Sequence, residues 1–290
     1  MGISRRDFIK ISGLTAAGIA AGGLNASTPA LAETRGISGV AEKALLNDPS
    51  KCIGCLSCAI ACKKSNGLPN VYKYSSFTDG STWTTVKLKN SSLQGQPAKY
   101  NLKVQCMHCS KPSCAAVCPT GAIYRRDDGI VVIDQETCVG CKYCVQACPF
   151  NVPGVSSQTG TSRKCTLCEN RLREGKITAC AEACPLGAIQ FGDREVLLTK
   201  AEARVNELKS SGYTNAAVFG KHELGGLKVL YILPDTPETV GLPANPRLAT
   251  SDSLLKWAAG LAMAGYLAAF PLRKLFQDEG DKTENAMRKG

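Results

Sequence analysis

The sequence predicts an α+β protein in which two similar cysteine-rich modules, related by a pseudo-twofold repeat, precede a single C-terminal transmembrane helix. Three observations support this prediction. The 290 residues include 16 cysteines, a proportion well above ordinary usage. The stretch Cys118–Ile123 recurs 66 residues later as Cys184–Ile189, with the same Cys-Pro and Gly-Ala-Ile residues. An apolar stretch without charges runs from Trp257 to Leu272. With 44% hydrophobic and 20% charged residues, the composition excludes a disordered or fibrous chain.

The first 32 residues resemble a twin-arginine export signal. Arg5 and Arg6 precede a weakly apolar stretch over 11–24, and Ala30-Leu31-Ala32 has the small residues of a cleavage site. A basic start to an amphipathic helix is the alternative. Such signals export proteins that are already folded, and residues 33–50 then form an N-terminal extension of the mature chain.

The sixteen cysteines fall into four groups of four, with no cysteine left over. Groups one and three have the spacing C-x2-C-x2-C-x3-C, and groups two and four have longer middle gaps of four and eleven residues. In chain order the groups are Cys52, Cys55, Cys58 and Cys62; Cys106, Cys109, Cys114 and Cys118; Cys138, Cys141, Cys144 and Cys148; and Cys165, Cys168, Cys180 and Cys184.

This spacing is typical of cubane [4Fe–4S] clusters. A tight C-x2-C-x2-C loop supplies three thiolates to one cluster, and the fourth cysteine ligates the partner cluster in two-cluster ferredoxins. Pro119, Pro149 and Pro185 follow the last cysteine of groups two, three and four, where a proline prevents a helix from continuing. We therefore expect two fused ferredoxin-like modules over 51–193 that bind four [4Fe–4S] clusters. Eight disulfides, structural zinc, or a mixture of clusters and zinc are the alternatives.

Proximity in sequence suggests how the groups exchange their fourth cysteines. Groups two and three are neighbours and are expected to interleave, which leaves groups one and four to pair. The predicted ligand sets are quartet A (Cys52, Cys55, Cys58, Cys184), quartet B (Cys165, Cys168, Cys180, Cys62), quartet C (Cys106, Cys109, Cys114, Cys148) and quartet D (Cys138, Cys141, Cys144, Cys118).

The charge balance agrees with buried anionic clusters. The net charge of +11 includes +2 in residues 1–32, so the mature chain carries +9, and four oxidised clusters with their thiolates add about −8. The basic excess is read as counter-charge, with no nucleic-acid partner. Six lysines flank the cysteine groups, and each is a tuning residue or a solvated surface residue: Lys51, Lys63, Lys64, Lys111, Lys142 and Lys164. His108, between two cysteines, is read as a hydrogen-bond donor to a cluster or a packing residue rather than a ligand.

The remaining elements follow from apolar patterning. Residues 83–88 and 100–104 alternate like strands of an insertion spanning about 72–104. Short strands are expected at 130–133, 189–191 and 228–233, and a helix capped by Thr199 is expected over 199–209. The Pro-rich stretch 234–246 reads as a linker within an extension over 194–252.

Residues 253–275 are expected to form the transmembrane helix. A helix over 254–272 would span about 28 Å, close to the thickness of the hydrocarbon core. Arg273 and Lys274 follow it, so the positive-inside rule places the tail 276–290 in the cytoplasm and the cysteine-rich part outside. A buried or surface helix is the alternative, because the stretch is short and rich in alanine.

No catalytic constellation is apparent, so the clusters are expected to relay electrons rather than to act on a substrate. The sequence resembles the four-cluster β subunits of molybdopterin oxidoreductase complexes, most closely membrane-bound formate dehydrogenase. The resemblance covers about residues 48–275. The residues that carry it are Cys52–Cys55, Cys106–Cys109, Cys148–Pro153, Arg163–Cys168, Ala203–Lys209 with Gly212 and Tyr213, and Gly241–Pro243.

The resemblance implies the partners as well as the pairing of the cysteine groups. Such subunits take electrons from a catalytic molybdopterin (molybdenum or tungsten) α subunit and pass them to a membrane cytochrome b γ subunit and quinone. An export signal on this chain is instead more similar to the iron–sulfur subunit of a periplasm-facing nickel–iron hydrogenase. Hydrogenase subunits are therefore the alternative partners, and the periplasmic face of the membrane is the expected location.

Overall fold

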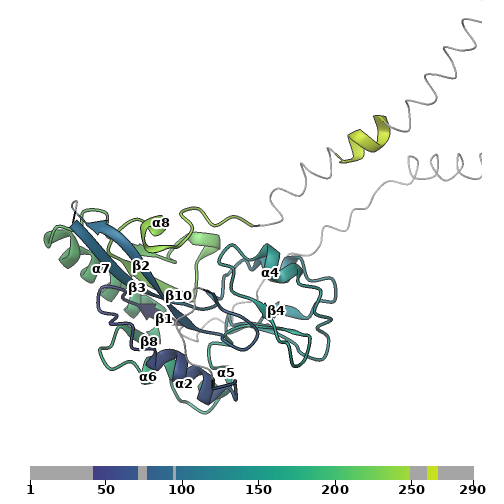
Figure 1. Ribbon diagram of the computed structural model, residues 1–290, viewed down its shortest axis with the longest axis horizontal. Helices are drawn as coiled ribbons and strands as arrows, with labels where there is room; N and C mark the ends of the chain where they lie inside the picture. The colour runs from purple at the N-terminus through teal and green to yellow at the C-terminus, as the bar shows by residue number, and fades with distance from the viewer. Residues whose placement is uncertain (1–41, 71–76, 94–95, 249–259, 267–290) are drawn as a thin grey trace, which may run out of the picture. The chain divides into compact units, whose positions relative to one another are not determined.

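The computed structural model of the chain describes residues 42–70, 77–93, 96–248 and 260–266. The predicted export signal (1–32), most of the N-terminal extension and the tail (276–290) lie outside the described residues. The described part is a mixed α+β fold (Figure 1).

A four-stranded sheet organises the fold, in the order β8-β1-β10-β9. β1 (Lys43–Asn47) pairs in parallel with β10 (Val229–Leu233) and antiparallel with β8 (Ile189–Asp193), and β9 (Ala217–Phe219) pairs antiparallel with β10. The strands at 189–191 and 228–233 predicted from the sequence are thus confirmed, β8 being longer. The sheet joins segments from both ends of the described chain.

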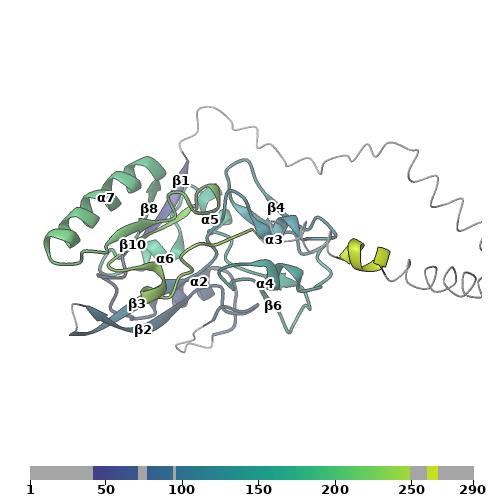
Figure 2. The ribbon, with the colours of Figure 1, turned by 90° about the horizontal axis from the view of Figure 1, so that it is seen from above.

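The two faces of this sheet carry different partners because side chains alternate along a strand. Ala44, Leu46, Leu230 and Ile232 pack against α7 (Arg194–Ser210). Leu45, Val229, Tyr231 and Leu233 pack into the core that contains cysteines of the predicted clusters. Figure 2 shows α7 on one side of the sheet and the β2–β3 hairpin on the other. The sheet is therefore buried on both faces and supports the cysteine-bearing loops.

The predicted helix over 199–209 begins earlier than expected. α7 starts at Arg194, directly after β8, and Asp193 rather than Thr199 occupies its N-cap position. Thr199 lies inside the helix, where its hydroxyl donates to the carbonyl of Glu195 at 3.1 Å. The cap prediction was wrong because burial of Leu197 and Leu198 against the sheet extends the helix through its first turn.

The predicted inserted strands form a long hairpin. β2 (Thr85–Leu93) pairs antiparallel with β3 (Gln96–Val104), from Thr85 opposite Val104 to Leu93 opposite Gln96. The inner ends of both strands are buried, with Val86 at 1% and Leu102 at 1% exposure. The hairpin thus packs one end against the cysteine region.

Short helices and hairpins build the cysteine-rich region. The helices are α2 (Ser57–Ser65), α3 (Ser113–Ala116), α4 (Tyr143–Ala147), α5 (Glu169–Arg173) and α6 (Ala179–Glu182). Two small antiparallel pairs accompany them: β4 (Ile123–Arg125) with β5 (Val131–Ile133), and β6 (Gly154–Val155) with β7 (Ser162–Arg163). α3 and β4 recur as α6 and β8 with the 66-residue shift of the sequence repeat. The strand β4, which the sequence reading omitted, is the equivalent of β8.

The Pro-rich stretch read as a linker is folded near its middle. α8 (Pro237–Val240) follows β10, and Val240 and Leu242 are buried in the main core. A short 3-10 turn, η1 (Glu223–Gly225), precedes β10.

Of the predicted transmembrane helix, only 260–266 is described, and these residues are helical. Within the described ranges, no helix combines the length and the apolar character needed to cross a bilayer. The membrane span stays a prediction.

Candidate iron–sulfur site

The four C-x-x-C loops share one backbone feature. In each loop, the residue immediately before the second cysteine has a positive φ: Gly54 (74°), His108 (46°), Gly140 (69°) and Leu167 (53°). Glycine adopts this left-handed conformation without steric cost, whereas leucine and histidine are strained in it. The sequence has glycine at two of these positions and a strained residue at the other two, so all four loops turn alike although the later cysteines of each group are spaced differently.

The local turns also point backbone N–H groups at sulfur. The N–H of His108 donates to Cys106 Sγ at 3.5 Å, and the N–H of Leu167 donates to Cys165 Sγ at 3.4 Å. The N–H of Ser162 reaches Cys138 Sγ at 3.3 Å. Such bonds stabilise negative charge on sulfur, which is the state that iron requires of its thiolate ligands.

Helix packing brings the cysteine groups together in pairs. α2, which carries Cys58 and Cys62, contacts α6, which carries Cys180. α3, which carries Cys114, contacts α4, which carries Cys144. Group one therefore lies against group four, and group two lies against group three, as the interleaved prediction requires.

The thiols that affect the pKa of a given cysteine give further support for the predicted pairing of the groups. Burial raises the pKa of Cys62 well above its usual value, and nearby Cys165, Cys168 and Cys180 raise it further. These are the other three members of quartet B.

Quartets A and C show the same relation. Burial raises the pKa of Cys52, and the thiols of Cys184 and Cys55 add to the rise. Burial likewise raises the pKa of Cys109, with contributions from its quartet C neighbours Cys106, Cys148 and Cys114.

In quartet D, fewer members are linked through their effects on each other's pKa. Burial raises the pKa of Cys144, the Ser162 hydroxyl opposes the rise, and Cys138 and Cys141 add to it. Cys118 packs with Cys144 in one apolar cluster, and Cys138 and Cys141 are the thiols with the largest effect on the pKa of Cys144. The ligand assignment of all four quartets stays a prediction.

Contacts between quartets arrange them in a row. Cys58 of quartet A and Cys180 of quartet B interact electrostatically, as do Cys165 of quartet B and Cys106 of quartet C. Cys114 of quartet C interacts with Cys144 of quartet D. The order is therefore A, B, C, D.

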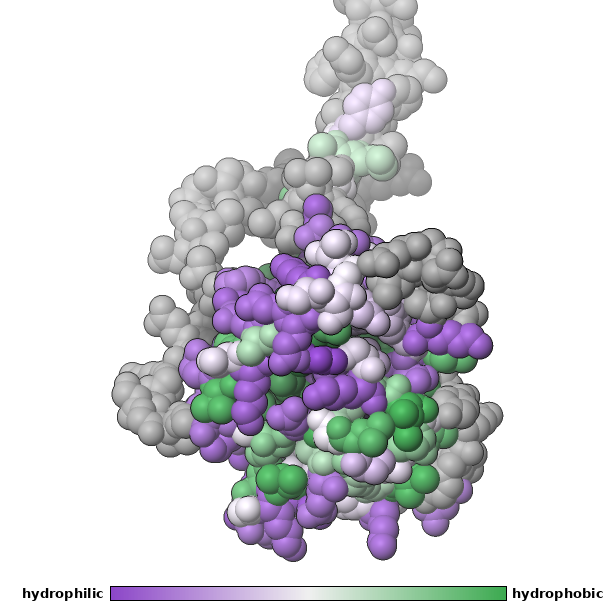
Figure 3. All heavy atoms as spheres, turned by 90° about the vertical axis from the view of Figure 1, so that its left-hand side faces the viewer, coloured by the Kyte–Doolittle hydropathy of each residue, from purple (hydrophilic) through white to green (hydrophobic). Residues whose placement is uncertain are grey.

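The two ends of this row reach the surface. Cys55 in quartet A and Cys141 in quartet D are exposed, whereas neither quartet B nor quartet C contains an exposed cysteine. Exposed apolar side chains flank both ends: Ile53 and Leu186 beside quartet A, and Val139 and Tyr143 beside quartet D. Figure 3 shows that, on the face it draws, most strongly apolar side chains gather in the lower half. An electron could thus enter or leave at either end.

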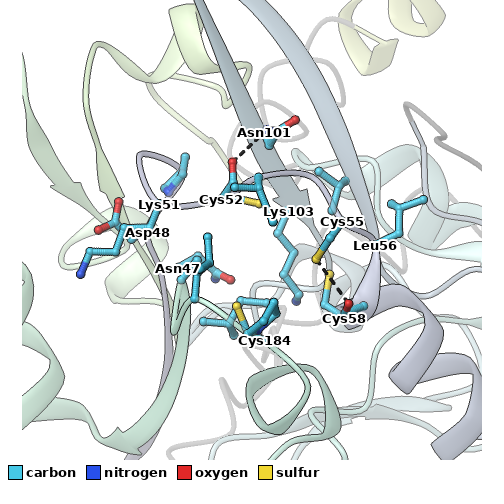
Figure 4. Close-up of a pocket in the computed structure, with 18 residues that line it drawn as sticks. Asn47, Asp48, Lys51, Cys52, Cys55, Leu56, Cys58, Asn101, Lys103 and Cys184 are labelled. Atoms are coloured by element: carbon cyan, nitrogen blue, oxygen red, sulfur yellow. Dashed lines mark hydrogen bonds between the residues drawn. The ribbon is translucent and has the colours of Figure 1, made fainter.

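A pocket lies at quartet A. Its lining includes Cys52, Cys55, Cys58 and Cys184, together with Lys103 from β3 (Figure 4). Asn101, also on β3, donates from Nδ2 to the carbonyl of Cys52 at 2.8 Å. All four thiols of the predicted quartet thus border one space, drawn from the first and fourth cysteine groups.

The residues present fit anionic clusters. In the described part of the chain, buried side-chain atoms without a hydrogen-bond partner include five nitrogen donors: Lys103 Nζ, Gln105 Nε2, His108 Nε2, Arg125 Nε and Arg163 Nε. Burying an unpaired donor is unfavourable, and the sulfur of an iron–sulfur cluster is an acceptor.

Lys103 is the clearest case. Burial lowers its pKa, yet Cys180, Cys58 and Cys165 outweigh that effect, so the pKa of Lys103 lies above its usual value. Its side chain also lines the same pocket as the four thiols of quartet A. The sequence reading omitted Lys103, because a lysine in an alternating strand normally indicates the solvent face.

All sixteen cysteines are free thiols, so the structure does not contain the eight disulfides of the alternative reading. Among the described residues, no three His, Cys, Asp or Glu side chains converge closely enough to hold one metal ion. A cubane of four irons and four sulfides spaces its ligands more widely than a single ion does.

His108 is a buried residue whose ring accepts one hydrogen bond. It is 1% exposed, and its Nδ1 accepts a 3.1 Å bond from the N–H of Val131. Burial holds its pKa well below the usual value, so the ring is neutral and Nε2 carries the proton. This agrees with the prediction of a hydrogen-bonding or packing residue.

The six flanking lysines divide into two classes. Lys63 and Lys164 are buried and donate to backbone carbonyls, Lys63 to Pro69 and Ser81 and Lys164 to Val131 and Cys165. The other four are exposed: Lys51, Lys64, Lys111 and Lys142. Their exposure supports the prediction that these four are solvated surface residues.

Comparison with known proteins identifies the type of site. Residues 98–194 match the family described as a 4Fe-4S dicluster domain. The chain is 40% identical over 242 residues to the iron–sulfur subunit of nitrate-inducible formate dehydrogenase from Escherichia coli K12, covering 79% of this chain and 82% of that protein.

Two further relatives have a similar extent. The formate dehydrogenase iron–sulfur subunit of Haemophilus influenzae is 37% identical over 244 residues, with 79% and 78% coverage. A probable anaerobic dimethyl sulfoxide reductase chain of E. coli K12 is 35% identical over 207 residues, with 69% and 94% coverage. The cofactors of this site are [4Fe–4S] clusters.

Proposed function

Because this chain belongs to the family of formate dehydrogenase iron–sulfur subunits, we propose that it carries electrons through four [4Fe–4S] clusters bound by quartets A to D. Each cluster accepts and passes one electron at a time, and the protein supplies ligands, spacing and electrostatics. The chain itself performs no substrate chemistry.

The contacts between cysteines of successive predicted quartets support this function best. Electrostatic contacts link each quartet to the next, through Cys58 with Cys180, Cys165 with Cys106, and Cys114 with Cys144. Both terminal quartets have an exposed cysteine. A row whose exposed cysteines lie only in its two end quartets is suited to relaying electrons between two partners.

The partners follow from the family. A catalytic molybdopterin subunit of a formate dehydrogenase complex donates the electrons, and a membrane cytochrome b subunit and quinone receive them. The sequence features at 1–32 and 253–275 support a proposed location on the periplasmic face of the membrane, with one anchoring helix and a cytoplasmic C-terminus.

The proposal is tested on the complex purified anaerobically through this chain. We expect about sixteen irons and sixteen acid-labile sulfides per chain, and cluster EPR signals after dithionite reduction. Formate should reduce the same clusters in the complex but not in the chain separated from its catalytic partner. A colourless, EPR-silent chain would contradict the cluster assignment, and clusters that formate leaves oxidised in the complex would contradict the donor.

A second kind of catalytic partner is supported by one comparison. The probable dimethyl sulfoxide reductase chain is matched over 94% of its length, so the same relay serves another respiratory molybdopterin oxidoreductase in this alternative. The export-signal pattern at 1–32 favours nickel–iron hydrogenase subunits instead. Metal analysis of the copurified catalytic subunit separates these: nickel indicates a hydrogenase, and molybdenum or tungsten indicates a molybdopterin enzyme.

A further inference from the structure

Lys103 differs from the other buried lysines of the described chain. Four lysines are at most 3% exposed, and three of them have oxygen acceptors: Lys63 and Lys164 bind backbone carbonyls, and Lys228 binds Glu42 at 3.0 Å. Lys103 Nζ has no hydrogen-bond partner within the described residues. An uncompensated ammonium in the core is strongly unfavourable, so a negative group is expected beside it.

The surroundings of Lys103 contain sulfur from two quartets. Its charge interacts with Cys58 of quartet A and with Cys62, Cys165 and Cys180 of quartet B. Figure 4 shows the side chain extending from β3 among the quartet A cysteines. For the cysteines of quartets C and D whose pKa is shifted, Lys103 is not among the largest causes of the shift, and the lysine that acts on Cys114 is Lys164. Lys103 therefore acts at the boundary between A and B.

A fixed cation at this place changes the energy of reduction. Reduction of a cluster adds one electron, with no bond made or broken and no proton taken up, so the negative charge increases by one. A nearby ammonium stabilises the reduced state more than the oxidised state. Burial keeps the effective dielectric low, and salt screens the interaction little.

We propose that the Lys103 ammonium, placed between quartets A and B, raises the reduction potentials of the two clusters bound there. This inference rests on the proposed function, because it needs clusters at both quartets. In this proposal, the Lys103 side chain makes the clusters of quartets A and B easier to reduce relative to those of quartets C and D.

The test is an EPR-monitored redox titration of the purified complex, with dithionite as the reductant. Lys103→Met removes the charge and keeps a similar length. We expect the equilibrium constant for reduction of two clusters to fall at least tenfold, which corresponds to 59 mV for one electron. The potentials of the other two clusters should change by less. Lys103→Arg keeps the charge and should restore values close to those of the wild type.

Lys228→Met is the matched control. Lys228 is equally buried, but Glu42 neutralises it and no cysteine is among the groups that shift its pKa. Its removal should leave the equilibrium constants for reduction of all four clusters within a few-fold of wild type. Equal shifts in both methionine variants would indicate a general effect of losing a buried lysine and would overturn the proposal.

Iron and sulfide content separates failure of this inference from failure of the proposed function. A wild-type chain without iron contradicts the clusters themselves. A Lys103→Met variant with full iron and unchanged potentials contradicts only the role of Lys103. If Lys103→Met and Lys103→Gln both lose iron while Lys103→Arg retains it, the charge serves cluster retention, and the tuning role is overturned.

Discussion

Asn101 donates a 2.8 Å hydrogen bond from its side-chain amide to the backbone carbonyl of Cys52. Asn101 lies on β3 of the inserted hairpin, 49 positions from the first cysteine loop. The same amide borders Gly54, where an added Cβ would lie 2.9 Å from Asn101 Oδ1. The hairpin thus holds the loop of quartet A in place from outside the cysteine groups.

Gly54→Ala should destabilise the protein more than an ordinary glycine replacement. The positive φ of Gly54 costs alanine about 1–2 kcal/mol, and the new methyl displaces Asn101, which loses a bond worth about 1 kcal/mol. Gly67→Ala is the control, because Gly67 has a similar φ of 61° and no atom within 4 Å of an added Cβ.

Anaerobic thermal unfolding should therefore show a larger decrease in Tm for Gly54→Ala than for Gly67→Ala. Combining Gly54→Ala with Asn101→Ala should cost less than the sum of the single changes, because both remove the same bond. Equal effects of the two glycine replacements would show that the contact with Asn101 is unimportant.

Tyr231→Phe should weaken the attachment of the hairpin to the sheet. The Tyr231 hydroxyl is fully buried on β10 and donates to the carbonyl of Lys103 at 2.7 Å. Its removal should lower the free energy of unfolding by about 1 kcal/mol. Tyr124→Phe, at a half-exposed position on β4, should change the denaturation midpoint little. A similar midpoint for both variants would contradict the importance of this bond.

Lys142→Gly should stabilise the third cysteine group. Lys142 is exposed, precedes α4, and has a φ of 66°. Glycine adopts this conformation without steric cost, whereas other residues lose about 1–2 kcal/mol. Lys142→Ala is the control at the same site, since it removes the long side chain and keeps the strain. We expect Tm to be higher for glycine than for alanine, and the opposite order would exclude strain at Lys142.

The cysteine pattern was informative because cluster ligation requires short, regular spacing between cysteines, and this spacing is visible in the sequence itself. It predicted the four groups, the repeat and the pairs of groups that lie together. The four-stranded sheet was harder to predict from the sequence. β1 pairs in parallel with β10 across 184 positions, and no local sequence pattern identifies such a distant partner strand.

Long-range contacts also explain the residues that the sequence reading omitted. Lys103 and Asn101 have ordinary strand sequences, and their importance comes from a hairpin that packs on loops from elsewhere in the chain. Leu167 and His108 adopt a left-handed backbone without being glycine, so sequence alone does not reveal that they match Gly54 and Gly140.

The exchange of fourth cysteines between groups is open to a direct test. If quartets A and B form as proposed, Cys184 ligates the same cluster as Cys55, although it belongs to the fourth group. Cys55→Ala and Cys168→Ala provide reference spectra. Cys55 binds the cluster of the first group, and Cys168 that of the fourth group, whether or not the fourth cysteines are exchanged.

The reduced EPR spectrum and the iron content of Cys184→Ala should therefore match those of Cys55→Ala, with loss or conversion of one cluster. By the same reasoning, Cys62→Ala should match Cys168→Ala, since Cys165, Cys168 and Cys180 are the thiols that raise the pKa of Cys62. A Cys184→Ala spectrum that instead matches Cys168→Ala would show that each group binds its own cluster. In that case the contact between α2 and α6 would bring two separate clusters together without any exchange of ligands.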